Sequence, residues 1–203
     1  MSRAFGQHFV LPALPDFSRQ QPDIQVDVTL SDDIADMVAL GLDFAIRIGE
    51  LPDSSLIARK LGDIDLVLAV PRALVDIQGM PKDVKTLSTW PAIGFRVPGT
   101  QSLYRWRFEK DGQVVTHKPR DVRLTVDSIE DAALLVAAGA GIAPLPRYLV
   151  GDQLASGDLV AALPDHLLPT LPVHMCFPAT AKRPERVEAL AQHLSQALRS
   201  KAL

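Results

Sequence analysis

Histidine, cysteine and serine are the residues of this chain whose side chains could bind a metal or attack a substrate. The five histidines are scattered, and none forms a pair at helical or strand spacing, so we predict no metal site. His174 and Cys176 share one face of an expected strand, but two soft ligands are too few for a metal, and a thiol among apolar neighbours is more often a core residue. Nothing local activates Ser128 or Cys176 as a nucleophile. The sequence therefore predicts neither an enzyme nor a cofactor.

The glycine-rich motifs of hydrolases and nucleotide-binding proteins are missing. The sequence has no Gly-x-Ser-x-Gly elbow and no Gly-x-x-x-x-Gly-Lys loop. Gly139 and Gly141 are spaced like part of a dinucleotide fingerprint, but the segment runs into Pro144 where the fingerprint needs its third small residue. We interpret these two glycines as a tight turn between a helix and a strand.

Two arginines are candidates for holding an anion, because a guanidinium group can form two parallel hydrogen bonds to a carboxylate. Arg47 interrupts an apolar strand near its carboxyl end, where open α/β sheets place ligands, although it could equally pair with Asp43 or anchor a loop. Arg96 follows an expected strand at 92–95 and precedes a loop that could close on a ligand or simply be solvated.

Two serines lie at expected strand-to-helix junctions. Ser31 precedes Asp32, and Ser128 follows Asp127. Such junctions present backbone N–H groups to an anion, and the same serines are also ordinary helix caps. Both roles are compatible, because a cap at the mouth of a cleft still lines the cleft.

Composition limits the kind of protein this can be. A chain of 203 residues with 47% hydrophobic content can bury a large core, as one domain or as two small lobes. A net charge of -3 has the wrong sign for a surface that grips nucleic-acid phosphates. Cys176 is the only cysteine, residues 1–7 contain no secretory signal, and no apolar run approaches the roughly 20 residues that cross a bilayer. We therefore expect a cytoplasmic protein without a membrane anchor.

Short aliphatic runs alternate with helical segments, which predicts an α/β fold with a mostly parallel sheet covered by helices. The expected helices are 9–19, a helix from Ile34 to Leu42 capped at Ser31–Asp33, a short helix from Pro71, 128–139, 147–155 and 184–199. The expected strands are 25–30, 44–48, 56–61, 64–70, 92–95, 122–126, 142–144, 159–163 and 173–177, with a hairpin over 104–115 that turns at Asp111-Gly112.

Residues 42–59, which read LDFAIRIGELPDSSLIAR, closely resemble LysR-type transcriptional regulators. Further segments resemble the same family in the same order along essentially the whole chain. They are 4–6, 11–12, 21–24, 30–32, 106–108, 138–144 with Pro146, and 154–160. Such regulators sense a small effector in one domain and bind DNA through another.

The resemblance implies a fold similar to type 2 periplasmic-binding proteins, with two Rossmann-like lobes joined by two crossover strands. Lobe I would comprise residues 1–69 and 173–203, and lobe II residues 70–172. The implied effector-binding residues are Ser2, Arg3, Ser31, Asp32, Ile48, Phe95, Arg96, Asp127, Ser128 and Pro144. The implied dimer-interface residues are Phe9, Ala13, Phe17, Val28, Ala132 and Val136.

The chain departs from the family pattern at its beginning. The helix-turn-helix domain and linker helix expected upstream are absent, so DNA would be bound only through that missing domain. Only Met1–Arg3 precede Ala4–Gly6, which normally follow a complete first strand. We expect an effector-binding and oligomerisation domain that forms a homodimer, or a tetramer in the full-length protein, and binds a small organic anion. The alternative is an extracytoplasmic solute-binding protein of a transport system.

Overall fold

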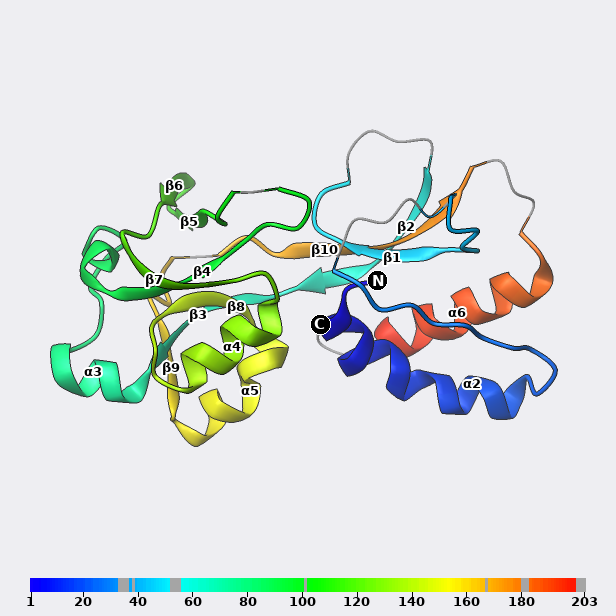
Figure 1. The fold of residues 1–203 in the computed structure, drawn as a ribbon, viewed down its shortest axis with the longest axis horizontal. Coiled ribbons are helices and arrows are strands. Elements are labelled where there is room, and N and C mark those ends of the chain that lie inside the picture. Colours follow the sequence, from blue (N-terminus) through cyan, green and yellow to red (C-terminus); the bar gives the residue numbers. More distant parts are fainter. Residues whose placement is uncertain are drawn as a thin grey trace. The chain divides into compact units, whose positions relative to one another are not determined.

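The computed structural model describes residues 1–32, 37, 39–51, 56–100, 102–166, 168–179 and 183–199 (Figure 1). Contacts divide the chain into unit 1, Met1–Ile64 with Leu171–Leu203, and unit 2, Asp65–Thr170. The chain therefore leaves unit 1 and returns to it after unit 2 is complete. Among the described residues, no helix combines the length and the apolar composition that crossing a membrane requires.

Unit 1 contains a three-stranded antiparallel sheet. Its strands are β1 (Ala45–Ile48), β10 (Leu171–Pro178) and β2 (Leu56–Ile64), in the order β1-β10-β2. Arg47 lies opposite His174 in the β1–β10 ladder. Helix α6 (Glu185–Arg199) packs on β2, and Figure 1 shows α6 and α2 on the same side of the sheet.

The first helix starts earlier than the sequence predicted and changes its hydrogen-bonding pattern along its length. It runs through α1 (Arg3–Phe5), the π-helical η1 (Gly6–Val10), the 3₁₀ segment η2 (Leu11–Ala13) and α2 (Leu14–Gln20). Pro12 and Pro15 lack the N–H group that a regular α-helical ladder needs, which accounts for the irregular register around them. The run is anchored to α6 where Ala13 O lies 2.9 Å from His193 Nε2.

The strand expected at 25–30 is not formed, although the segment is not helical either. Its backbone meets Met1, whose ammonium group donates to Thr29 O at 3.3 Å and whose carbonyl accepts from Ser31 N at 2.9 Å. A β-ladder needs several paired residues, and here the segment bonds to Met1 alone. A sequence that favours extended backbone therefore does not form a strand without a partner strand. The helix expected from Ile34 falls mostly outside the described residues.

Unit 2 contains strands β3 (Leu66–Pro71), β4 (Pro91–Phe95), β7 (Asp121–Val126), β8 (Ala143–Pro146) and β9 (Leu159–Ala162). Its helical segments are α3 (Arg72–Gln78), η3 (Thr86–Thr89), α4 (Ile129–Ala137) and α5 (Arg147–Ser156). The order β8-β3-β9 is antiparallel, β4–β7 is parallel, and a parallel bridge between Ala92 and Ile142 connects the two groups.

The expectation of a mostly parallel sheet is therefore wrong. Unit 1 has antiparallel ladders throughout its described strands, and β3 runs antiparallel to both of its neighbours in unit 2. Hydrophobic patterning indicates which face of a strand is buried, but strand direction depends on where the chain enters and leaves each unit. The α/β class itself holds.

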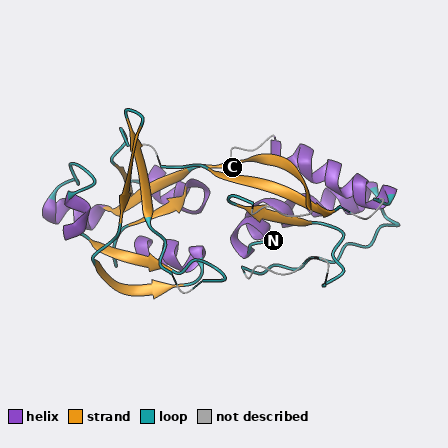
Figure 2. Ribbon diagram, turned by 90° about the horizontal axis from the view of Figure 1, so that it is seen from above, coloured by secondary structure: helices purple, strands orange, loops and turns teal. Residues whose placement is uncertain are grey.

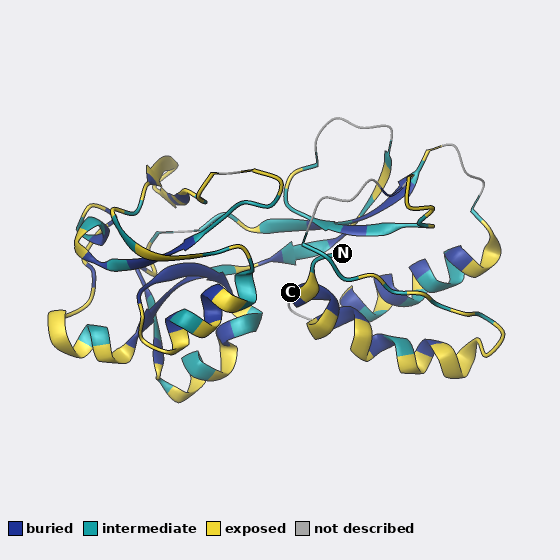
Figure 3. Ribbon diagram, viewed as in Figure 1, coloured by how far each residue is buried: buried dark blue, intermediate teal, exposed yellow. Residues whose placement is uncertain are grey.

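Strand β3 separates two apolar clusters in unit 2. Leu68 and Val70 belong to the cluster with Trp90 and Trp106, whereas Val67 and Ala69 pack with α4 and α5. Successive side chains of a strand point to opposite faces, so this alternation shows that both faces of β3 are covered. Figure 3 shows the corresponding pattern on α4, with one buried side and one exposed side.

The predicted hairpin is formed by β5 (Trp106–Lys110) and β6 (Gln113–His117). Asp111 and Gly112 have φ values of 51° and 73°. Two consecutive positive φ values characterise the type I′ turn, whose twist matches that of the flanking strands. The hairpin rises from unit 2 as a narrow ribbon (Figure 2).

Candidate functional site

Four of the predicted effector-binding residues lie together in unit 1. Arg3 N donates to Asp32 Oδ1 at 3.0 Å, and the Arg3 guanidinium reaches Leu30 O at 3.4 Å. Ser31 is held beside the same helix start by its hydrogen bond to Met1 O. Ser2 caps α1 without using its side chain for the cap. Contacts between residues 29 positions apart thus bring a hydroxyl, a guanidinium and a carboxylate to one place.

Arg47 belongs to the surroundings of this group, a relationship that the sequence left open. Burial lowers the pKa of the Met1 ammonium group, the nearby Asp32 carboxylate acts in the opposite direction, and Arg47 lowers this pKa further. The charge of Arg47 also lowers the pKa of the Cys176 thiol, against the larger effect of burial, which raises it. Ile48, the fifth predicted residue of unit 1, ends β1 opposite Val173. We call Ser2, Arg3, Ser31 and Asp32 the unit 1 group.

The second set of predicted residues lies at the ends of two parallel strands in unit 2. Phe95 at the end of β4 is in register with Val126 at the end of β7, and Arg96 N donates to Val126 O at 2.8 Å. Because the strands are parallel, both carboxyl ends lie at one edge of the sheet, and Asp127 and Ser128 follow there. This edge is where open α/β sheets bind ligands. We call Phe95, Arg96, Asp127 and Ser128 the unit 2 group.

Ser128 is the N-cap of α4, as the sequence predicted, but the details of the cap differ. Its Oγ accepts from Asp131 N at 3.2 Å and donates to Glu130 Oε2 at 3.1 Å. Glu130 was not predicted to be a site residue. Its Oε1 is buried and has no hydrogen-bond partner in the described part of the chain. Pro144 is buried in β8 opposite Leu68, so it offers apolar surface only.

The side chains of these two groups could hold an anion. Each group contains one arginine and one carboxylate, with two serine hydroxyls in the unit 1 group and one in the unit 2 group, a set that can orient an anion through charge and hydrogen bonds. Burial raises the pKa of the Cys176 thiol, with Arg47 opposing the effect, so the reactive thiolate is disfavoured. The described residues contain no cluster of three metal-ligating side chains.

The residues predicted for a dimer interface are mostly inside the two cores. Phe9 and Phe17 are each 2% exposed, Ala132 is 1% exposed and Val136 is fully buried. Ala13 is also buried, whereas Val28 is half-buried. A side chain this buried adds no contact area to a partner, so any interface on these helices has to use their opposite, exposed faces.

Comparison with known proteins identifies the family. The family model described as the LysR substrate binding domain matches residues 1–199. This chain belongs to that family. The matched range includes all of unit 2, all of unit 1 except its last four residues, and all ten predicted effector-binding residues.

Relatives of this LysR substrate-binding domain are bacterial regulators. The HTH-type transcriptional regulator PtxR of Pseudomonas aeruginosa is 32% identical over 185 residues, which is 90% of this chain and 57% of PtxR. An uncharacterised HTH-type transcriptional regulator of Haemophilus influenzae is 28% identical over 93% of this chain and 65% of its own length. The chain thus spans 57% to 65% of these relatives.

Solved structures of LysR-type regulators have the same fold as this LysR substrate-binding domain. The regulatory domain of CrgA, a LysR-type transcriptional regulator from Neisseria meningitidis, superimposes with a TM-score of 0.83 and 26% identity over 97% of this chain and 95% of that domain. The fold is therefore the type 2 periplasmic-binding-protein-like one. The matches favour a regulator domain over the transport receptor considered from the sequence.

Proposed function

We propose that this domain senses a small organic anion for a LysR-type regulator and transmits the binding to a DNA-binding domain. The family match over residues 1–199 and the regulators among its relatives support this proposal. The protein would work in the cytoplasm as a homodimer, and would bind its effector without making or breaking a bond.

The observation that carries the anion assignment is the edge formed by β4 and β7. The Arg96 backbone bond to Val126 holds Arg96 beside Asp127 and the Ser128 cap, where the N-terminus of the nine-residue α4 adds a favourable field for negative charge. The unit 1 group, with Arg3 and Ser31, is a second candidate for contact with the effector. Units 1 and 2 would be the two lobes expected from the resemblance.

An effector acts only if it binds two conformations of the protein with different affinities. An effector that contacts the unit 2 group better in one conformation would favour that conformation. Effector binding would then change the geometry of the dimer, and through it the position of the DNA-binding domains.

A thermal-shift screen of small carboxylates, each paired with the primary alcohol of the same shape, tests the proposal. A carboxylate at 100 times its Kd should stabilise the folded domain by about 2.7 kcal/mol, while its matched alcohol should not. Failure of every carboxylate in a broad panel, with alcohols or amines stabilising instead, would overturn the anion assignment.

Variants then test the site. Arg96→Met should weaken the binding of the hit, and Arg107→Met, which changes an exposed arginine of the hairpin, is the matched control. Ser128→Asn keeps a residue that can cap α4, so a loss of binding in this variant reports ligand contact rather than helix damage. If a combined Ser31→Ala, Arg96→Met and Ser128→Asn variant binds the hit like the wild type, the assignment of these groups is wrong.

A further inference from the structure

The inner face of the β5–β6 hairpin changes character along its length. Cross-strand pairs place Trp106 opposite His117, Phe108 opposite Val115 and Lys110 opposite Gln113. Residues two apart on a strand share a face, so all six side chains lie on the same side of the hairpin. Trp106 and Phe108 are each 2% exposed and His117 is 9% exposed, whereas Lys110 and Gln113 near the turn are exposed.

A cavity of about 250 Å³ opens beside the end of the hairpin that carries the turn. Phe108 and Val115 supply its apolar walls, Lys110, Asp111 and Gln113 supply charged and amide groups, and His166 comes from the segment that follows β9. All of these residues belong to unit 2, and none belongs to the predicted effector groups. The volume is below the roughly 300–1,000 Å³ of typical ligand pockets, so it suits only a molecule smaller than a drug.

The polar groups of this cavity are not used by the fold. His166 Nδ1 is buried and has no hydrogen-bond partner in the described part of the chain, where only its backbone N–H is bonded, to Leu163 O at 2.9 Å. The ion pairs found among the described residues include neither Lys110 nor Asp111. Because His166 Nδ1 is buried, a ligand in the cavity does not reach it, and Lys110 and Asp111 are the charged groups that the ligand can contact.

We propose that this cavity binds a free α-amino acid with an apolar side chain. Such a molecule carries a carboxylate and an ammonium group on one carbon, which match the adjacent cation and anion of Lys110 and Asp111. Its apolar side chain would contact Phe108 and Val115, while Gln113 hydrogen-bonds to the carboxylate. A simple carboxylate would leave Asp111 facing a like charge, and a simple amine would do the same to Lys110.

Three ligands of nearly equal shape separate these chemistries. L-Leucine has both charges, 4-methylpentanoate has only the carboxylate, and isoamylamine has only the ammonium group. In ¹H–¹⁵N spectra of the whole domain, leucine should shift the backbone amide signals of Phe108, Lys110, Gln113, Val115 and His166. Because exposed ion pairs are worth up to about 1 kcal/mol, each half-ligand should bind about threefold to fivefold more weakly than leucine.

Charge-removing variants should act selectively. Lys110→Met should weaken leucine about threefold without weakening isoamylamine, because only leucine has the carboxylate that Lys110 contacts. Asp111→Asn should weaken leucine similarly without weakening 4-methylpentanoate. Asn tolerates the positive φ of 51° at this position, so the turn is preserved. Lys118→Met changes an exposed lysine outside the cavity and serves as the control.

Two results would overturn the inference. The first is leucine-induced shifts confined to residues outside the cavity lining, or no shifts at all at millimolar leucine. The second is equal affinity for leucine and 4-methylpentanoate, which would show that the ammonium group is not recognised. Neither result bears on the effector groups, whose signals belong to other residues, so failure here is distinguishable from failure of the proposed function.

Discussion

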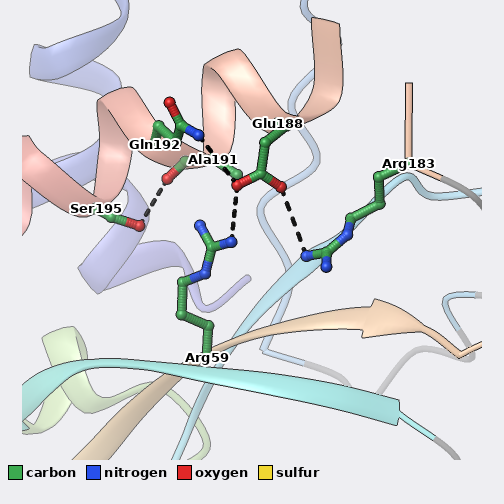
Figure 4. A network of polar contacts seen from close by, with 6 residues as sticks. All are labelled: Arg59, Arg183, Glu188, Ala191, Gln192 and Ser195. Carbon is green, nitrogen blue, oxygen red and sulfur yellow. Dashed lines mark hydrogen bonds and ion pairs between the residues drawn. The ribbon is translucent and has the colours of Figure 1, made fainter. Parts of the chain in front are cut away.

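Arg59 on β2 donates to Glu188 on α6, with Arg59 Nη2 at 2.8 Å from Glu188 Oε1 across 129 positions of sequence (Figure 4). Arg183 approaches the other carboxylate oxygen at 3.6 Å, and Gln192 donates to Oε1 at 3.4 Å. The Arg183 guanidinium also lies 4.4 Å from the centre of the Phe177 ring. The Glu188 carboxylate thus links the sheet of unit 1 to the helix that covers it.

Removing the charge of Glu188 should destabilise unit 1. Glu188→Gln keeps the shape of the side chain but removes its charge-assisted hydrogen bonds, and the half-buried pair should contribute about 1 kcal/mol to the free energy of unfolding. Urea denaturation at neutral pH measures this loss. Arg59→Met should cost a similar amount, and Arg186→Met, at an exposed position on α6, should cost almost nothing.

The effect of Glu188→Gln should depend on pH. The hydrogen bond from Arg59 holds the pKa of Glu188 below its ordinary value of 4.5. The ionised carboxylate therefore stabilises the folded state fully above that value, and the contribution disappears as the pH falls through the lower pKa of the folded state. Wild type and variant should converge in acid. A difference that stays constant down to the lowest accessible pH would rule out this electrostatic origin.

Gly141 should not tolerate a side chain. A Cβ atom there would lie 2.8 Å from Pro91 O, against the backbone of β4. Gly141→Ala should therefore lower the free energy of unfolding by about 1–3 kcal/mol, the usual cost of overpacking. Gly151→Ala is the control, because nothing lies within 4 Å of its Cβ position inside α5. That change should stabilise the protein by about 0.5–1 kcal/mol in thermal or urea unfolding.

His117 should make unit 2 sensitive to mild acid. Burial lowers its pKa from 6.5, the neighbouring Arg120 lowers it further, and its ring lies 5.4 Å from that of Trp106. The unfolded chain then binds a proton at higher pH than the folded one. Stability should be complete above about pH 6.5 and fall as the pH decreases toward the lower pKa of the folded state.

His117→Phe should flatten this dependence, because it retains an aromatic ring beside Trp106 and removes the titrating group. His8→Gln, at an exposed position, should leave the dependence as it is in the wild type. Urea unfolding followed between pH 7 and pH 5 checks both variants. An unchanged slope in His117→Phe would assign the acid sensitivity to another group.

Leu134 should lie in the dimer interface if the domain dimerises through α4. Its side chain is 68% exposed, on the face opposite Ala132 and Val136. Leu134→Glu should weaken self-association at least about tenfold, because it places a charge in an apolar contact. Sedimentation velocity measures the change. Val114→Glu, at a 54% exposed site on the hairpin, should have no effect, and equal behaviour of the two variants would exclude α4 from the interface.

Local signals in the sequence were enough to predict several elements. The Asp111-Gly112 pair specified the hairpin turn because two positive φ values are needed there. Ser128 specified the start of α4 because its hydroxyl caps a backbone N–H group within three residues. The apolar spacing of Val187, Leu194 and Leu198 specified α6, and all three side chains are buried. In each case the deciding interaction lies within a few residues.

The tertiary structure decided what depends on distant segments. Strand direction in both units, the absence of a ladder at 25–30 and the burial of Phe9 and Phe17 all follow from which segments meet in space. The Arg59–Glu188 pair and the cavity beside the hairpin have the same origin. By itself the sequence determined the α/β class and the local caps and turns, because they depend on residues close together in the chain. It also determined the family resemblance, which is a property of the residue types alone. Only the folded chain fixed the neighbours across the sheet, since hydrophobic alternation specifies a buried face but not the residue that covers it.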